Sequence, residues 1–316
     1  MVLEGKRSQG IGVLLPRLPP ASQMKEAIFN LDETKLNLDS ISMVQLNLPT
    51  PDEIMAIKAA IEDPSAILDK PEEWCLAVSK IPKIQQRLNA WIFKYEFGSV
   101  LEDAMISIKN LADATEAVSK SRGLRSLLGM ILTIGNFVNC GTSRGNAMGF
   151  EFAFLVKAGD LKDSDNKKTM LQYATEFILE KGPFHIVEEL APVKNAVRVS
   201  FGDLDKTANE LKAKYNSAQK AVDEIIQISN PNDIFVEKMK PFMERCAREM
   251  KMMEDELEKE RKKFRDLLKF LGYLDKAILK MEPSEWFPEI VEVCQKIAQF
   301  IPKKVEKKEK KKEEYG

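Results

Sequence analysis

The chain has 316 residues, of which 44% are hydrophobic and 31% are charged. This composition supplies enough apolar surface for a folded core and excludes wholesale disorder. Lys and Arg number 48 against 49 Asp and Glu, and the formal charge of -1 lacks the basic excess typical of proteins that coat nucleic acid. We therefore expect no nucleic-acid partner, and any electrostatic binding site must be local.

Residues that commonly hold metals or move protons are scarce. The four cysteines form no CxxC pair, which predicts neither a disulfide framework nor a cysteine zinc site. His185 is the only histidine, although histidine supplies most acid–base groups and metal ligands near neutral pH. We expect no enzymatic activity, no metal and no cofactor. The segment after Met1 is charged and no long apolar stretch follows, which predicts no membrane span and favours a cytoplasmic protein.

Helical periodicity runs through the amino-terminal part, whereas hairpin signals are scarce. Thr50-Pro51-Asp52-Glu53 predicts a helix start, because Thr50 can cap, Pro51 needs no amide partner and Glu53 can bond back to the cap. This helix is expected to run to about Glu62, before Asp63-Pro64. Residues 71–117 keep a helical pattern with a break expected near Gly98.

The middle of the chain predicts two further helices around a glycine-rich loop. Residues 123–139 are apolar on most sides, which predicts a helix buried between others. Gly141 is well placed as its left-handed cap. After the loop at 141–149 an amphipathic helix is expected, with one stripe formed by Met170, Leu171, Ala174, Phe177 and Ile178.

The carboxyl-terminal half changes to the heptad pattern of a coiled coil. A break at 230–232 separates the two runs, and Glu260 interrupts the second run. Residues 233–271 as one helix would span roughly 55 to 60 Å, with a kink or an early turn at Pro241. Two long helices of this kind predict an elongated antiparallel segment. The first seam consists of Leu204, Ala208, Leu211, Tyr215, Ala218, Val222 and Ile225, and the second of Cys246, Met250, Met253, Leu257, Phe264, Leu267 and Leu271.

A last helix is expected at about 286–300. Residues 303–316 then hold seven lysines against four glutamates, which predicts a fraying helix or a disordered basic end. The expected organisation is therefore an all-α core over residues 1–300 and a lysine-rich tail over 301–316.

Four segments occur in order along the chain: GKRSQ at 5–9, LDKPE at 68–72, GNFVN at 135–139 and residues 160–166. Together they resemble the formin homology-two domain, an actin-assembly module. The sequence GNFVN at 135–139, followed by the loop glycines and Phe150, resembles the family's signature. GKRSQ at 5–9 with the apolar residues after it looks like the family's knob helix. LDKPE at 68–72 is similar to a stretch of the formin-one, formin-two and Cappuccino branch, and residues 160–166 lie where the family carries its post lysine motif.

The resemblance covers about residues 3–290 and implies a definite fold and partner. The family's domain is an all-helical rod with a globular knob, a coiled-coil segment and a post, and two copies join head to tail around the barbed end of an actin filament. Nucleation and processive capping of actin are therefore implied, as is a second formin subunit bound through the post.

Site residues are carried over position by position. The family's knob isoleucine and post lysine map to Val13 and Lys162, with Ile11 and Arg144 as further expected actin contacts. Valine keeps the branched apolar contact without one methylene, which is worth about 0.8 kcal/mol at full burial. The surface that receives a partner's lasso is expected at Gly135, Asn136, Asn139, Gly141, Gly149 and Phe150.

One departure from the family lies at the amino terminus. The family's lasso and linker have no counterpart before the knob helix, and the 15 prolines form no tract for recruiting profilin-actin. On this basis we expect a mainly monomeric species with weak barbed-end activity. The alternative is a regulatory or structural coiled-coil protein that binds actin or another formin without nucleating.

Simpler interpretations compete at single motifs. The loop at 141–149 matches neither Walker nor GxGxxG spacing and follows a helix, so packing is favoured over phosphate binding. His185 is expected to be structural, despite nearby Glu188 and Glu189. Arg144, Lys157 and Lys162 could form a basic face near the post. Trp74, Trp91 and Trp286 are expected in the core.

Overall fold

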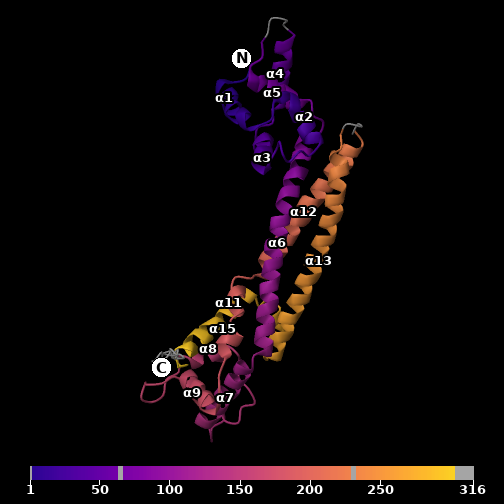
Figure 1. Ribbon diagram of the computed structural model, residues 1–316. Coiled ribbons are helices and arrows are strands. Elements are labelled where there is room, and N and C mark those ends of the chain that lie inside the picture. The colour runs from indigo at the N-terminus through magenta and orange to yellow at the C-terminus, as the bar shows by residue number, and fades with distance from the viewer. Residues whose placement is uncertain (1, 63–66, 229–232, 303–316) are drawn as a thin grey trace, which may run out of the picture. The chain divides into compact units, whose positions relative to one another are not determined.

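The computed structural model describes residues 2–62, 67–228 and 233–302. These residues form fifteen α-helices and one 3₁₀ helix, and within them the nearest approach to a sheet is an isolated bridge between Lys162 and Thr169. The prediction of an all-α protein is confirmed (Figure 1). Helix α4 (Pro51–Ile61) ends with Glu62 as its C-cap, which confirms the expected end at about Glu62. Asp63-Pro64, the break at 230–232 and the tail at 303–316 lie outside the described residues.

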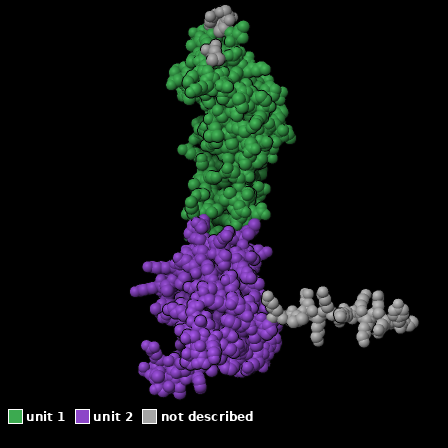
Figure 2. Space-filling model, turned by 90° about the vertical axis from the view of Figure 1, so that its left-hand side faces the viewer, with its two compact units in different colours: residues 1–104, 204–255 green, residues 105–203, 256–316 purple. Residues whose placement is uncertain are grey.

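The chain divides into two compact units, coloured separately in Figure 2. Unit 1 consists of Met1–Ala104 and Leu204–Asp255, and unit 2 of Met105–Asp203 and Glu256–Gly316. Unit 1 contains the amino-terminal helices together with the first part of α6, most of α12 and the first part of α13. Their bounds are α1 Gly5–Leu14, η1 Leu15–Arg17, α2 Ala21–Phe29, α3 Leu38–Leu46, α4 Pro51–Ile61, α5 Lys70–Ser79, α6 Ile84–Lys120, α12 Phe201–Ile226 and α13 Phe235–Phe270.

The capping residues expected at Thr50 begin α4 as predicted. The Thr50 hydroxyl accepts from the Glu53 amide at 3.2 Å, and the Glu53 carboxylate accepts from the Thr50 amide at 2.9 Å. This reciprocal pair satisfies two of the free amide donors at the start of a helix.

The break expected near Gly98 is wrong, because α6 continues through it without interruption. The chain turns instead between α5 and α6, where Pro82 cannot continue a helix and Lys83 has a φ of 55°. A glycine inside a helix costs only about 1 kcal/mol relative to alanine. The burial of Phe97 beside Gly98 outweighs that cost.

Heptad residues of α12 and the first part of α13 pack onto α6 within unit 1. Leu211, Ala218 and Ile225 are buried, as the seam predicts. Ion pairs join Lys83 to Glu224 at 2.9 Å and Lys214 to Glu96 at 2.7 Å. The residue numbers rise from Lys83 to Glu96 on one side and fall from Glu224 to Lys214 on the other, so α12 lies antiparallel to α6.

The buried guanidinium of Arg87 ties three helices of unit 1 together. It donates to the carboxylate of Asp233 at 2.9 Å and to the carbonyl of Pro82 at 3.0 Å. Its charge also lies 4.6 Å from the Phe29 ring and 5.0 Å from the Phe235 ring. Such a fully paired cation fixes the junction of α2, α6 and α13, because either charge alone would be costly to bury.

Unit 2 is organised around α15. Trp286 and Phe287 of this helix pack edge-on against Phe264, which in turn contacts Phe201. All three tryptophans of the chain are at most 1% exposed, which confirms their place in the core. The helices of unit 2, besides the ends of α6 and α13, are α7 Arg122–Val138, α8 Phe154–Ala158, α9 Met170–Lys181, α10 Ile186–Glu189, α11 Val193–Ala196, α14 Asp275–Ile278 and α15 Pro283–Ala298.

Helix α7 is buried along only part of its length, which corrects the expectation from its apolar sequence. Leu124, Leu127 and Ile131 are buried, whereas Phe137 and Val138 are 82% and 73% exposed. One face packs on α9 and α10, and no helix of the described part of the chain covers the apolar carboxyl-terminal turn. In the described ranges no helix combines the length and the hydropathy that crossing a bilayer requires.

Candidate functional site

Helix α1 of unit 1 carries the first group of candidate residues, and Arg7 holds it in place. The Arg7 guanidinium donates to the Glu53 carboxylate at 2.9 Å and to the carbonyls of Asn47 and Leu48 at 3.0 and 3.2 Å. These bonds fix α1 to the end of α3 and the start of α4. A planar guanidinium suits this role because its donors point in fixed directions.

The exposed tip of α1 is Val13. Its side chain is 65% exposed, whereas Ile11, two residues earlier, is completely buried. The burial of Ile11 argues against the expected direct contact with actin, since a residue two positions away on a helix faces a different direction. Ile11 anchors the helix to the core of unit 1, and Val13 presents an apolar group to solvent.

Lys162 lies in unit 2, at the base of a tight turn between α8 and α9. The Asp163 carboxylate braces this turn, accepting from the Lys167 amide at 2.9 Å and from the Tyr173 hydroxyl at 3.0 Å. The bond from Lys167 lowers the pKa of Asp163, burial opposes the shift, and the Tyr173 bond adds to it. Asn166 completes the turn with a φ of 58°.

The turn is also held to α15 by ion pairs. The Lys162 side chain takes no part in them. The ammonium of Lys296 pairs with Asp160 at 2.9 Å and with Glu292 at 2.9 Å. Lys168 pairs with Glu176 at 2.6 Å. Lys162 itself is exposed, and no ion pair joins it to any residue that the structure describes. It is thus an uncompensated positive charge on a fixed backbone.

One of the two asparagines of the signature, Asn136, holds the loop at 141–149 through its side chain. The Asn136 amide donates to the Ala147 carbonyl at 2.9 Å and accepts from the Ala147 amide at 2.7 Å. Asn139 donates to the Gly135 carbonyl at 2.9 Å. Gly141 has a φ of 78°, which confirms its predicted left-handed conformation. Within unit 2 the Asn136 side chain therefore holds the loop, whereas the Asn139 side chain bonds back to the end of α7.

The remaining predicted post residues lie around the same loop. Gly149 is exposed, and the ring of Phe150 contacts that of Phe154 edge-on at 5.7 Å. Arg144 is exposed at the tip of the loop, and Lys157 is exposed on α8. No described contact joins Arg144, Lys157 and Lys162 into one basic face.

An exposed apolar patch in this region was not predicted. Phe137, Val138 and Met148 are 82%, 73% and 97% exposed. We call these three residues the post patch. Periodicity could not reveal it, because an apolar residue at a helix end has the same sequence pattern whether a neighbour covers it or not. Three large exposed apolar side chains are typical of a surface that receives a partner.

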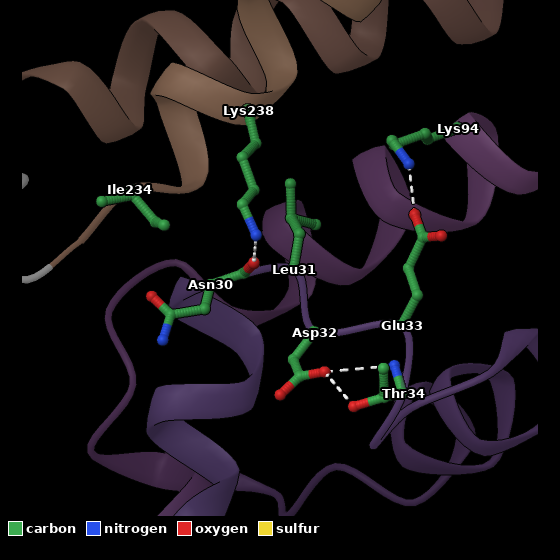
Figure 3. A pocket seen from close by; sticks show the side chains of 8 residues that line it. All are labelled: Asn30, Leu31, Asp32, Glu33, Thr34, Lys94, Ile234 and Lys238. Atoms are coloured by element: carbon green, nitrogen blue, oxygen red, sulfur yellow. Dashed lines mark hydrogen bonds and ion pairs between the residues drawn. The ribbon is translucent and has the colours of Figure 1, made fainter.

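Unit 1 also contains a polar hollow of about 480 Å³, shown in Figure 3. Lys238 donates to the Asn30 carbonyl at 2.5 Å, and Thr34 donates to the Asp32 carboxylate at 3.1 Å through its amide. Lys94 pairs with Glu33. Each charged side chain of this hollow thus has a partner: Lys94 and Glu33 pair with each other, and Lys238 and Asp32 bond to neutral groups. These contacts brace the turn after α2 against α6 and α13.

His185 is exposed at the start of α10, so its side chain does not lie in an enclosed site. Within the described ranges no three or more His, Cys, Asp or Glu side chains gather as metal ligands would.

Comparisons with known proteins identify the family. Residues 1–314 match the formin homology 2 domain. The chain is 28% identical to Formin-G of Dictyostelium discoideum over 271 residues, which are 85% of this chain and 25% of that protein. It is 32% identical to Formin-C of the same organism over 249 residues, 77% of this chain and 21% of that protein. Human Formin-1 is 27% identical over 310 residues, 93% of this chain and 22% of Formin-1.

The chain thus spans about a quarter or less of the length of these relatives. The match nevertheless extends over both units and includes α1, the loop at 141–149 and the turn that carries Lys162. The chain belongs to the formin homology 2 family.

Proposed function

We propose that this chain is an actin-binding module that nucleates filaments and caps or elongates them at the barbed end. The observation that carries the proposal is the exposure of Val13 and Lys162 on rigidly braced backbone, in a chain of the formin homology 2 family. We assign to both positions the roles of the family residues that grip actin. Their availability to a partner is what such a grip requires.

The proposed activity requires only binding contacts, and no covalent bond is made or broken. An apolar side chain such as Val13 contributes affinity when it enters a hydrophobic cleft, and a lysine facing an acidic surface contributes orientation and encounter rate. Nucleation then follows from holding subunits in filament-like geometry, which lowers the entropy that assembly must overcome. The module accordingly acts in the cytoplasm on the actin cytoskeleton and needs neither a catalytic residue nor a cofactor.

A second formin subunit is the other partner, bound through the post. The receiving surface comprises the post patch together with Gly135, Asn136, Asn139, Gly141, Gly149 and Phe150. Support comes from the exposure of the post patch and from the Asn136 side chain, which holds the loop at Ala147 through two hydrogen bonds. Arg144 at the exposed tip remains a candidate contact to actin.

Two substitutions test the actin contact. Val13→Ala removes two methyl groups, and their full burial is worth about 1.6 kcal/mol, or about tenfold in affinity. Lys162→Asp reverses a charge that should face an acidic surface, so it should weaken capping by about tenfold or more. Both residues are exposed, so helicity should not change. The measurement is barbed-end elongation of single filaments with profilin-free actin.

Matched controls separate these effects from general damage. Leu46→Ala alters an apolar residue of unit 1 that is 82% exposed, and Lys194→Asp reverses an exposed lysine of unit 2. Neither should affect capping. Wild-type capping by both Val13→Ala and Lys162→Asp would contradict the assigned contacts.

The post patch also favours the alternative function, a regulator that binds another formin without nucleating. The two are distinguished by mixing the chain with a full-length formin during pyrene-actin assembly. Intrinsic acceleration by the chain alone supports the primary proposal. Inhibition of the full-length formin without such acceleration supports the alternative.

A further inference from the structure

A second exposed apolar surface of unit 2 lies where α13 ends and α14 begins. Phe270, Leu274 and Leu279 are 73%, 78% and 68% exposed. We call residues 269–280 the α13–α14 surface. Single exposed apolar residues are ordinary, but three in so short a segment are typical of an interaction site. This surface includes neither the tip of α1 nor the post patch.

A hollow of about 240 Å³ opens within this surface. Drug-sized ligands occupy pockets of about 300 to 1,000 Å³, so this hollow is better matched to one bulky side chain of a partner. Its lining is mainly apolar, with Glu151 as the one carboxylate, and consists of Glu151, Phe152, Ala153, Leu271, Gly272, Tyr273, Leu274 and Ala277.

The walls of the hollow are rigid before any partner binds. Gly272 has a φ of 88°, and the following amide of Tyr273 donates back to the Leu268 carbonyl at 3.1 Å, a common way to end a helix. The Tyr273 hydroxyl accepts from the Trp286 indole at 3.0 Å, and the Phe152 ring lies 5.3 Å from the Trp286 ring. A preformed wall lowers the ordering cost of binding.

Uncompensated positive charge surrounds the apolar residues. Lys269, Lys276 and Lys280 are exposed, and no ion pair links them to a carboxylate anywhere in the described ranges. Many other lysines of unit 2 are paired, including Lys168 and Lys296. Asp275 is the single acidic residue of the segment, so its net charge is positive.

We propose that the α13–α14 surface docks an acidic amphipathic helix of a partner protein. One bulky apolar side chain of that helix fills the hollow, its apolar face covers Phe270, Leu274 and Leu279, and its carboxylates meet the three lysines. This is the helix-in-groove mode of recognition. A shaped hollow of this size fits one side chain of a helix better than it fits the surface of an anionic membrane.

The test uses the whole chain and a synthetic probe. The probe is a fluorescent peptide with leucines at positions i, i+3, i+4 and i+7 and glutamates elsewhere, and its control is the same composition in permuted order. Fluorescence anisotropy should show saturable binding of the first peptide only. Leu274→Ser, and separately Lys276→Glu with Lys280→Glu, should each weaken binding by about tenfold.

Control variants change exposed residues that lie outside the α13–α14 surface. Leu46→Ser and the pair Lys206→Glu with Lys212→Glu alter exposed residues of α3 and α12 and should leave the affinity unchanged. Equal binding of the permuted peptide, or full affinity in both surface variants, would overturn the proposal. So would binding of phosphatidylserine vesicles in place of the peptide, or self-association that Leu274→Ser abolishes, since these assign the surface to lipid or to a second copy.

Discussion

Two glycines of the loop at 141–149 differ in what surrounds them. A Cβ on Gly145 would lie 2.6 Å from the carbonyl oxygen of Asn139, whereas a Cβ on Gly149 would meet nothing within 4 Å. A backbone atom cannot move aside as a flexible side chain can. The loop therefore requires a glycine at the first position and tolerates a side chain at the second.

Alanine substitutions should separate the two positions. Gly145→Ala is expected to cost about 1 to 3 kcal/mol through this overlap and to accelerate amide hydrogen exchange in the loop. Gly149→Ala, as the matched control, should change stability by less than about 1 kcal/mol. Mass spectrometry measures the rate of amide hydrogen exchange in the loop. Urea unfolding measures the stability of the whole protein. Similar effects of both substitutions would contradict the geometry.

Among the elements, α1 depends on a carboxylate that lies far from it in sequence. Glu72 of α5 is fully buried and accepts from the amides of Val2, Leu3 and Asp69. Burial by itself raises the pKa of Glu72, but these bonds outweigh burial and hold the pKa below its ordinary value. The charged form of Glu72 thus fixes the segment that leads into α1.

This arrangement predicts a pH dependence. Because the pKa of Glu72 is lowered by folding, its contribution is present above the ordinary glutamate pKa of about 4.3 and is lost as the pH falls through the folded-state value. Glu72→Gln should cost about 2 kcal/mol at pH 7. The difference from wild type should begin to shrink as the pH falls below about 4.3 and should vanish below the folded-state pKa of Glu72, because the side chain at position 72 is then neutral in both proteins.

Urea unfolding between pH 7 and pH 3 measures this difference. Glu73→Gln, on the exposed side of the same helix, is the control and should have little effect at any pH. If Glu72→Gln lowers the free energy of unfolding by the same amount down to pH 3, the charge of Glu72 is not what holds α1.

At the scale of the whole molecule, the cysteines report on the folded state. Cys75, Cys246 and Cys294 are buried and Cys140 is exposed. Burial raises the pKa of Cys75 and Cys294 to about 11 and that of Cys246 to about 12. A thiol reacts as its thiolate, so the three buried cysteines are protected twice, by lack of access and by protonation.

Thiol labelling with DTNB at pH 8 should therefore give a single fast equivalent in the native protein. All four cysteines should react in denaturant. Cys140→Ser, which changes an exposed residue, should remove the fast phase without changing stability. A second fast thiol in the native state would show that one of the two units opens locally.

The sequence by itself determined the class of fold, most helix positions and the family. Capping at Thr50, the left-handed Gly141 and the seam of α12 rest on local chemistry or on short periodic patterns, which the folded chain preserves. The signature around Asn136 rests on residue identity, so it was also visible in the sequence. For the same reason Val13 and Lys162 could be named as candidates before their surroundings were known.

Tertiary structure decided which candidates face solvent. Ile11 and Val13 are both apolar and two residues apart, and only the packing of α1 distinguishes the buried anchor from the exposed tip. The same holds for the carboxyl-terminal turn of α7, for Phe270 and Leu274, and for the uninterrupted course of α6 through Gly98. Burial depends on what neighbours an element, and those neighbours come from distant parts of the chain that no local pattern encodes.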